Sequence, residues 1–274
     1  MAPKLSLTST KNILSGCTIP VLGYGVREND RPNLPPELKL APFSIFTNCA
    51  NDIRRGAIAE SVTEKALKAG FRHIDSAEVY GNERESVSAV EKAGLKRSEV
   101  FLTTKVLPQA MGSLSYTMCL GRRGAWRALA EAQKEGKARS IGVSNFGLHH
   151  LEELEEYIKS GDVGRIEVGQ YELHPWLGRA DLVDWLHKRG VVIEAYSPLA
   201  RGTRMDEPVL RAISEKHKKS PAQILIRWSL QKGFVPLPKS ATPERILGNA
   251  NVFDFELDED DMQSLHTDEY APST

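Results

Sequence analysis

The sequence has few cysteines, no excess of charge of either sign and no long apolar run. Its three cysteines (Cys17, Cys49 and Cys119) form neither a CxxC pair nor a metal-ligand spacing, so we expect no metal site. Lysine plus arginine and aspartate plus glutamate number 36 each, which gives no general attraction to nucleic acid or an anionic membrane. No apolar run approaches the about 18 residues of a membrane span, and the first ten residues lack a signal-peptide core. We therefore expect a cytoplasmic protein that acts on small molecules.

The chain alternates short β-rich runs with helical stretches over its 274 residues, a length close to the roughly 250 residues of one (β/α)₈ barrel. This alternation predicts parallel βαβ units, and we interpret residues 1–274 as a single domain. The predicted strands are 19–26, 73–75, 100–105, 138–144, 166–172, 191–197 and 234–239. Seven strands are one short of a closed barrel, so we expect an α/β fold of the TIM-barrel type that is incomplete or distorted.

Polar side chains stand at the ends of most predicted strands. In parallel α/β folds, ligands bind beyond the carboxyl ends of the strands, so these residues are candidates for a site. They are Asp75, Lys105, Ser144 with Asn145, Gln170, Tyr196 with Ser197, and Lys239 with Ser240.

Asp75, Tyr80 and Lys105 form a chemically coherent set. A tyrosine phenol, with a reference pKa of about 10, is a weak proton donor at neutral pH. A neighbouring ammonium favours the phenolate and lowers that pKa, while a carboxylate holds the ammonium in place. Such a tyrosine could protonate the alkoxide that develops when hydride attacks a carbonyl. The alternative for each residue alone is structural: a helix cap, a packed ring and a solvated lysine.

Several motifs in this order resemble the aldo-keto reductase family. They are GFRHIDSAEVYGNE (70–83), TTK ending at 105, GVSNF (142–146), QYELHP (170–175), AYSPL (195–199) and PLPKSATPERILGN (236–249). The resemblance implies a (β/α)₈ barrel that binds NADPH and reduces an aldehyde or ketone to an alcohol. It implies Tyr80 as proton donor, Lys105 as its pKa partner and Asp75 as the anchor of Lys105.

The resemblance also implies how the cofactor is held. Tyr196 would stack on the nicotinamide, and an arginine in the last motif suits a phosphate, which favours NADP over NAD. The remaining implied contacts are Ser144, Asn145 and Gln170 to the carboxamide, Ser197 and Leu199 along the pyrophosphate, Lys239, Ser240 and Arg245 to the 2′-phosphate, and Asn249 to the adenine.

The chain departs from the family pattern in two places. Residues 27–57 form an insertion where the family has a short loop, and a deletion near 118–123 removes the fourth strand with its catalytic histidine. Residues 113–120 could supply a makeshift strand instead. We interpret both anomalies as splice or gene-model errors. The alternatives to an active reductase are therefore a non-catalytic NADPH-binding protein and an aberrant splice product. The sequence leaves the oligomeric state open between monomer and homodimer.

Overall fold

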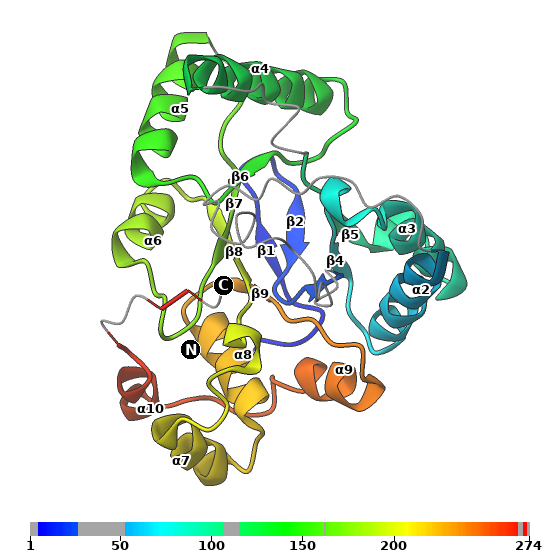
Figure 1. Ribbon diagram of the computed structural model, residues 1–274, viewed down its shortest axis with the longest axis vertical. Helices are drawn as coiled ribbons and strands as arrows, with labels where there is room; N and C mark the ends of the chain where they lie inside the picture. The colour runs from blue at the N-terminus through cyan, green and yellow to red at the C-terminus, as the bar shows by residue number, and fades with distance from the viewer. Residues whose placement is uncertain (1–4, 27–52, 107–114, 162, 268–270, 273–274) are drawn as a thin grey trace.

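The computed structural model describes residues 5–26, 53–106, 115–161, 163–267 and 271–272. Most of the predicted insertion, residues 27–52, lies outside the described residues, and residues 53–57 begin a helix. Figure 1 shows helices arranged around a central group of strands. None of the helices in the described ranges is both long enough and apolar enough to cross a bilayer.

The strands and helices alternate along most of the chain. The strands are β1 (Thr10–Asn12), β2 (Thr18–Pro20), β3 (Tyr24–Gly25), β4 (His73–Asp75), β5 (Phe101–Thr103), β6 (Gly142–Ser144), β7 (Val168–Glu172), β8 (Val192–Tyr196) and β9 (Val235–Leu237). The α-helices are α2 (Ile53–Lys68), α3 (Glu83–Lys92), α4 (Ser115–Lys134), α5 (Leu148–Gly161), α6 (Ala180–His187), α7 (Pro208–His217), α8 (Pro221–Gln231), α9 (Pro243–Ala250) and α10 (Glu259–Ser264).

Seven parallel strands form two half-sheets, in the orders β3-β4-β5 and β6-β7-β8-β9. The half-sheets meet where β3 approaches β9: the amide of Gly23 donates to the carbonyl of Pro236 at 3.0 Å, and that of Gly25 to Pro238 at 3.2 Å. Gly23 is required for this approach, because a Cβ there would lie 2.4 Å from a Leu237 methyl carbon. The predicted parallel α/β architecture is confirmed.

The two half-sheets do not meet on the other side, between β5 and β6. In the part of the chain that the structure describes, no strand stands there, and we call this space the seam. The amide of Phe101 donates to Arg72 and the carbonyl of Thr103 accepts from Ser76, so these residues bond toward β4. In a parallel strand, the N–H and C=O groups of successive residues point toward the two neighbouring strands in turn, so the N–H and C=O of Leu102 point toward the seam. The fourth strand was predicted to be missing; residues 107–114, which follow β5 along the chain, lie outside the described residues.

Residues 115–120 do not supply the makeshift strand predicted for 113–120, and residues 113 and 114 lie outside the described residues. From Ser115 onward they lie in α4, which runs from Ser115 to Lys134. The sequence continues into ten residues, 125–134, dominated by alanine, leucine, glutamate and other good helix formers, and the helix extends upstream from them.

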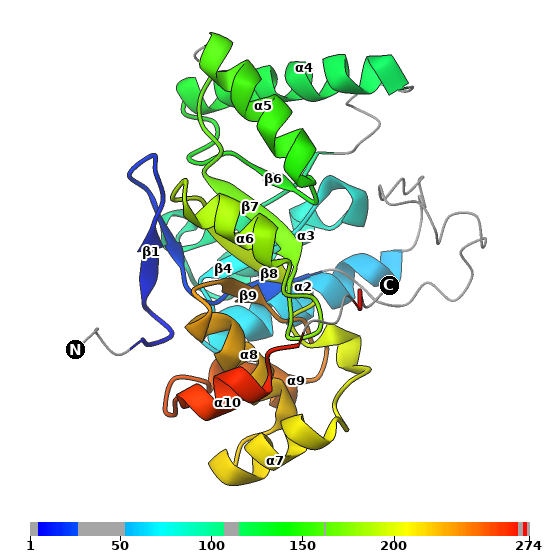
Figure 2. The same ribbon diagram turned by 90° about the vertical axis from the view of Figure 1, so that its left-hand side faces the viewer.

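An antiparallel hairpin, β1 with β2, precedes the first parallel strand, and Figure 2 shows it at one end of the strands. Ile13 and Ile19, from the turn and from β2, pack against Val192, Val235 and Leu237 of β8 and β9. The hairpin thus closes the end of the barrel that lies away from the carboxyl ends of the strands.

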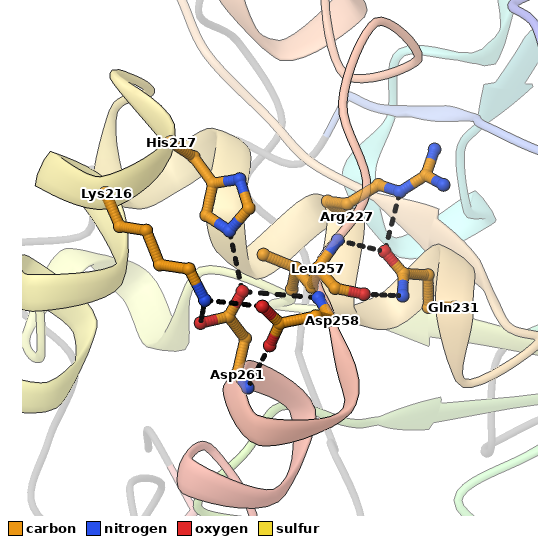
Figure 3. Close-up of polar contacts among 7 residues, drawn as sticks. All are labelled: Lys216, His217, Arg227, Gln231, Leu257, Asp258 and Asp261. Carbon is orange, nitrogen blue, oxygen red and sulfur yellow. Dashed lines mark hydrogen bonds and ion pairs between the residues drawn. The ribbon is translucent and has the colours of Figure 1, made fainter.

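A polar cluster fastens α10 to the end of α7 (Figure 3). Lys216 Nζ contacts Asp258 at 2.6 Å and Asp261 at 2.8 Å, and the ring of His217 lies 2.6 Å from the second Asp261 oxygen. Asp258 also caps α10, since its side chain accepts from the Asp261 amide at 2.9 Å. These contacts hold α10 against the end of α7.

Candidate functional site

One large cleft, of about 1850 Å³, lies at the carboxyl ends of the parallel strands. Every residue that the sequence analysis placed in the site lines it. They are Asp75, Tyr80, Lys105, Ser144, Asn145, Gln170, Tyr196, Ser197, Leu199, Lys239, Ser240, Arg245 and Asn249. This volume includes the opening between β5 and β6, since Trp126 and Lys137 also line the cavity.

Asp75 and Lys105 form a short ion pair at the ends of β4 and β5. Lys105 Nζ donates to Asp75 Oδ1 at 2.6 Å and to the carbonyl of Ser76 at 2.7 Å. The same ammonium lies 5.5 Å from the centre of the Tyr80 ring. Burial is the largest influence on Lys105 and lowers its pKa, but the charges of Asp75, Tyr80 and Glu194 and the hydrogen bond to Asp75 together outweigh it, so the net pKa is raised. The lysine is therefore a stable cation beside the tyrosine.

Tyr80 stands on a single 3₁₀ turn, Glu78–Tyr80, which the chain anchors at both ends. The amide of Glu78 donates to the carbonyl of Lys105 at 3.0 Å, which ties the turn to the lysine that faces its tyrosine. On the other side, Asn82 accepts a hydrogen bond from Ser76 at 2.8 Å and donates to the carbonyl of Val26 at 3.0 Å. These bonds fix Tyr80 relative to the half-sheet β3-β4-β5.

The opposite wall of the cleft comes from β6, β7 and β8. Ser144 and Asn145 end β6, and Asn145 has a φ of 59°, in the left-handed region that asparagine tolerates. Its Oδ1 accepts a hydrogen bond from the hydroxyl of Tyr196 at 3.1 Å, so the aromatic ring at the end of β8 is held in place. Gln170 on β7 is buried and donates to Asp75 Oδ1 at 2.8 Å.

The far end of the cleft is basic and lies before α9. Lys239 and Ser240 follow β9, and the hydroxyl of Ser240 accepts from the Thr242 amide, the residue that precedes α9. Arg245 is exposed in the first turn of α9, and Asn249 is buried in its last turn. Within the described residues, neither Lys239 nor Arg245 forms an ion pair with a carboxylate, so both cations face the cleft uncompensated. An anionic group fits this end of the cleft.

Two features of the cleft were missed by reading strand ends. Glu194 lines the cleft from within β8, where it is 1% exposed. Its signal was a charged residue inside the apolar run VVIEAY. The cleft also continues into the seam, between Leu102 on β5 and Gly142 on β6 and up to Trp126 on α4. Among the described residues, no histidine lines the cleft.

Comparison with known proteins gives a consistent result. The sequence model of the Aldo/keto reductase family matches residues 57–124 and 120–267, two segments that meet near the predicted deletion. The chain is 38% identical over 236 residues to glyoxal reductase of Bacillus subtilis, covering 78% of this chain and 84% of that protein.

Solved structures extend the likeness to the fold. An aldo/keto reductase from Brucella melitensis has a TM-score of 0.76 and 32% identity, covering 94% of this chain and 98% of the other. A variant of Gox0644 in complex with NADPH has a TM-score of 0.73 and 30% identity, covering 94% of this chain and 92% of the other. These neighbours support the predicted (β/α)₈ barrel type.

Proposed function

The chain belongs to the aldo/keto reductase family, and from that premise we propose that it reduces an aldehyde or ketone to an alcohol with NADPH. The observation that carries the proposal is the Asp75–Lys105 ion pair with Tyr80 beside it, in a cleft that the predicted cofactor residues also line. A glyoxal reductase among the relatives makes small aldehydes a reasonable first set of substrates.

In the proposed reaction, Tyr80, Lys105 and Asp75 have separate roles. When bound, NADPH supplies the hydride that the carbonyl carbon accepts. Tyr80 donates its proton to the carbonyl oxygen as negative charge develops there. The Lys105 ammonium stabilises the phenolate that Tyr80 becomes, and Asp75 holds the ammonium at 2.6 Å. Because the chain lacks a histidine in the cleft, Tyr80 alone orients the carbonyl oxygen in this scheme. The loss of one positioned donor costs about 10²–10³ in rate, so we expect slow turnover.

The side chains that line the cleft are of the types that would bind the parts of NADPH. Lys239 and Arg245 are cations without a carboxylate partner in the described chain, as a 2′-phosphate requires. Tyr196 presents an aromatic ring held by Asn145, which suits stacking on a nicotinamide. Ser144 and Gln170 stand beside it for the carboxamide, Ser197 and Leu199 for the pyrophosphate, Ser240 for the phosphate, and Asn249 for the adenine.

Replacing Tyr80 with phenylalanine tests the proposal. The change removes the proton that the scheme donates and keeps the ring, so NADPH oxidation with a panel of aldehydes should fall to background while NADPH still quenches tryptophan fluorescence. The matched control is Tyr157→Phe, on α5, whose hydroxyl accepts from Arg127 outside the cleft. Undiminished turnover by the Tyr80 variant would refute the assigned role.

A second candidate, a non-catalytic NADPH-binding protein, is favoured by the open seam and by the absence of a histidine from the described lining. The same assay separates the two functions. Saturable NADPH binding by the wild-type chain, without turnover of any carbonyl in the panel, would favour the binding protein.

A further inference from the structure

Glu194 is a buried carboxyl group that the proposed reaction does not use. It lies on β8 and receives contacts from three other strands. Its Oε2 accepts a hydrogen bond from Gln170 Nε2 on β7 at 2.5 Å. Its Oε1 lies 3.5 Å from the Thr103 hydroxyl on β5 and 3.4 Å from His73 Nε2 on β4. Contacts from β4, β5 and β7 place this carboxyl inside the barrel, where an unpartnered charge would be costly.

The side-chain amide of Gln170 joins Glu194 to the Asp75–Lys105 pair. Gln170 Nε2 donates to Glu194 at 2.5 Å and to Asp75 Oδ1 at 2.8 Å. An amide nitrogen has two hydrogens and an ionised carboxylate only accepts, so both donors of Gln170 are committed. The remaining polar atom, Gln170 Oε1, accepts no hydrogen bond from the described residues, and Gln170 lines the cleft. Gln170 is therefore left with an acceptor for a ligand and no donor.

We propose that Glu194 is a positioning residue that fixes the orientation of the Gln170 amide, so that the cleft presents an acceptor to the carboxamide –NH₂ of the nicotinamide. The inference rests on the proposed function, since it assumes that the nicotinamide lies beside Gln170. When Glu194 is neutral it no longer requires a donor from Gln170. A protonated Glu194 carboxyl can donate to Gln170 Oε1 if the Gln170 amide rotates by 180°, so both orientations of the amide are then compatible with Glu194. The orientation of Gln170 then depends on Asp75 alone.

The charge of Glu194 changes in an accessible pH range. Burial, followed by repulsion from Asp75, raises the pKa of Glu194 to about 7. The titratable groups that face it are Asp75, Lys105 and His73. Burial and the charge of Lys105 lower the pKa of His73 to about 3, and the pKa of Lys105 is raised, so neither changes charge between pH 6 and pH 8. Glu194 is ionised toward the upper end of that range and neutral toward the lower end.

The test compares two ligands that differ only in the group that meets Gln170. Isothermal titration calorimetry would measure the Kd of NADP⁺ and of its 3-acetylpyridine analogue, which has a methyl ketone in place of the carboxamide. At pH 8 the wild-type chain should bind NADP⁺ about tenfold more tightly, the value of one hydrogen bond to a well-placed acceptor. The ratio should fall as the pH is lowered to 6, because only Asp75 then holds the Gln170 amide. In Glu194→Gln the ratio should be small and independent of pH.

A matched control removes a different buried carboxylate. Glu167 is 4% exposed, bonds Gln133 and the Ile141 amide, and does not line the cleft, so Glu167→Gln should keep the wild-type ratio and its pH dependence. A wild-type ratio that is flat between pH 6 and pH 8 would overturn the proposal even if Glu194→Gln fails to fold. Failure of the wild-type chain to bind NADP⁺ would instead count against the proposed function.

Discussion

The Asp75–Lys105 pair should contribute to both stability and turnover, and Asp75→Asn tests this by removing the charge of Asp75, which accepts from Lys105 and also from Gln170. The side chains are 6% and 21% exposed, and Lys105 keeps its bond to the Ser76 carbonyl when Asp75 loses its charge. Removing one partner of a fully buried pair costs about 3–5 kcal/mol. Because Lys105 is one-fifth exposed and retains a partner, we expect a loss of roughly 2–3 kcal/mol. For a chain of this size that lowers Tm by roughly 3–5 °C.

The same change should shift the pH dependence of turnover. The Asp75 charge is the largest of the contributions that raise the pKa of Lys105 against the effect of burial. Without that charge the ammonium is lost at a lower pH, so the alkaline limb of kcat should move to lower pH. At neutral pH kcat itself should fall by roughly 10²-fold as Lys105 loses its fixed position.

Urea unfolding followed by tryptophan fluorescence, and kcat between pH 6 and pH 10, would check both effects. The control is Asp184→Asn. Asp184 pairs with Lys188 at 2.7 Å, and because their side chains are 60% and 69% exposed, the pair should contribute less than about 1 kcal/mol to the free energy of unfolding. Equal losses of stability in the two variants would refute the reasoning about burial. An unmoved alkaline limb would refute the assignment of that limb to Lys105.

Two further changes test how the barrel is held together. Asp261→Asn should destabilise the chain by about 1–3 kcal/mol at pH 7, because Asp261 is buried and accepts from Lys216. Burial raises the pKa of Asp261, but the hydrogen bonds outweigh it and the net pKa is lowered. The contribution is therefore complete above the ordinary pKa of about 4 and is lost as pH falls through the lowered pKa of the folded state, so the difference in urea unfolding between wild type and variant should shrink progressively below pH 4. Gly142→Ala would place a Cβ 2.1 Å from the Val168 carbonyl oxygen and should lower the free energy of unfolding by about 1–3 kcal/mol. The control is Gly178→Ala, whose Cβ would have no atom within 4 Å and should leave stability unchanged. Equal Tm values for the two variants would contradict this.

The site was predictable because parallel strands bring their carboxyl ends to one edge. The strand His73–Asp75 was predicted with its observed bounds, the predicted strand 19–26 spans part of β2 and all of β3, and the other five overlap β5 to β9. Each polar residue that ended a predicted strand therefore had to line the same cleft, whatever the error in the strand's length. Predicting that these residues share the carboxyl-terminal end of the sheet needed only the order of strands and helices along the chain, not their packing.

Other elements gave too weak a pattern to be predicted. The first strand of the hairpin, Thr10–Asn12, is short and mostly exposed, so alternation of apolar residues is absent. The residues that close the barrel with it, Ile13 and Ile19, are apolar but find their partners on β8 and β9, far along the chain. Glu194 was missed for a related reason: its partners come from β4, β5 and β7, and a sequence shows none of these contacts.

The seam divides the proposed chemistry between the two half-sheets. The proton-donating set, Asp75, Tyr80 and Lys105, stands on β3-β4-β5, whereas Gln170 and Tyr196 stand on β6-β7-β8-β9. With no strand between β5 and β6 in the described chain, backbone pairing aligns the halves at the β3–β9 contact alone. The hydrogen bond of Gln170 to Asp75 crosses the interior and supplies a second constraint, as does the longer contact of Thr103 with Glu194.

These crossing bonds therefore have a larger role here than in a closed barrel. In a closed barrel the fourth strand would hold the distance between the ends of β5 and β6, and the interior side chains would only fill the space. In this chain the polar bonds that join the half-sheets, and so set the distance from Tyr80 to the proposed nicotinamide site, include the backbone bonds at Gly23 and Gly25, the bond of the Tyr24 hydroxyl to the Ser240 carbonyl and the buried polar group around Gln170. A change that loosens that group should lower kcat more than it raises the Kd for NADPH, because proton donation requires both half-sheets whereas the predicted cofactor contacts lie on one.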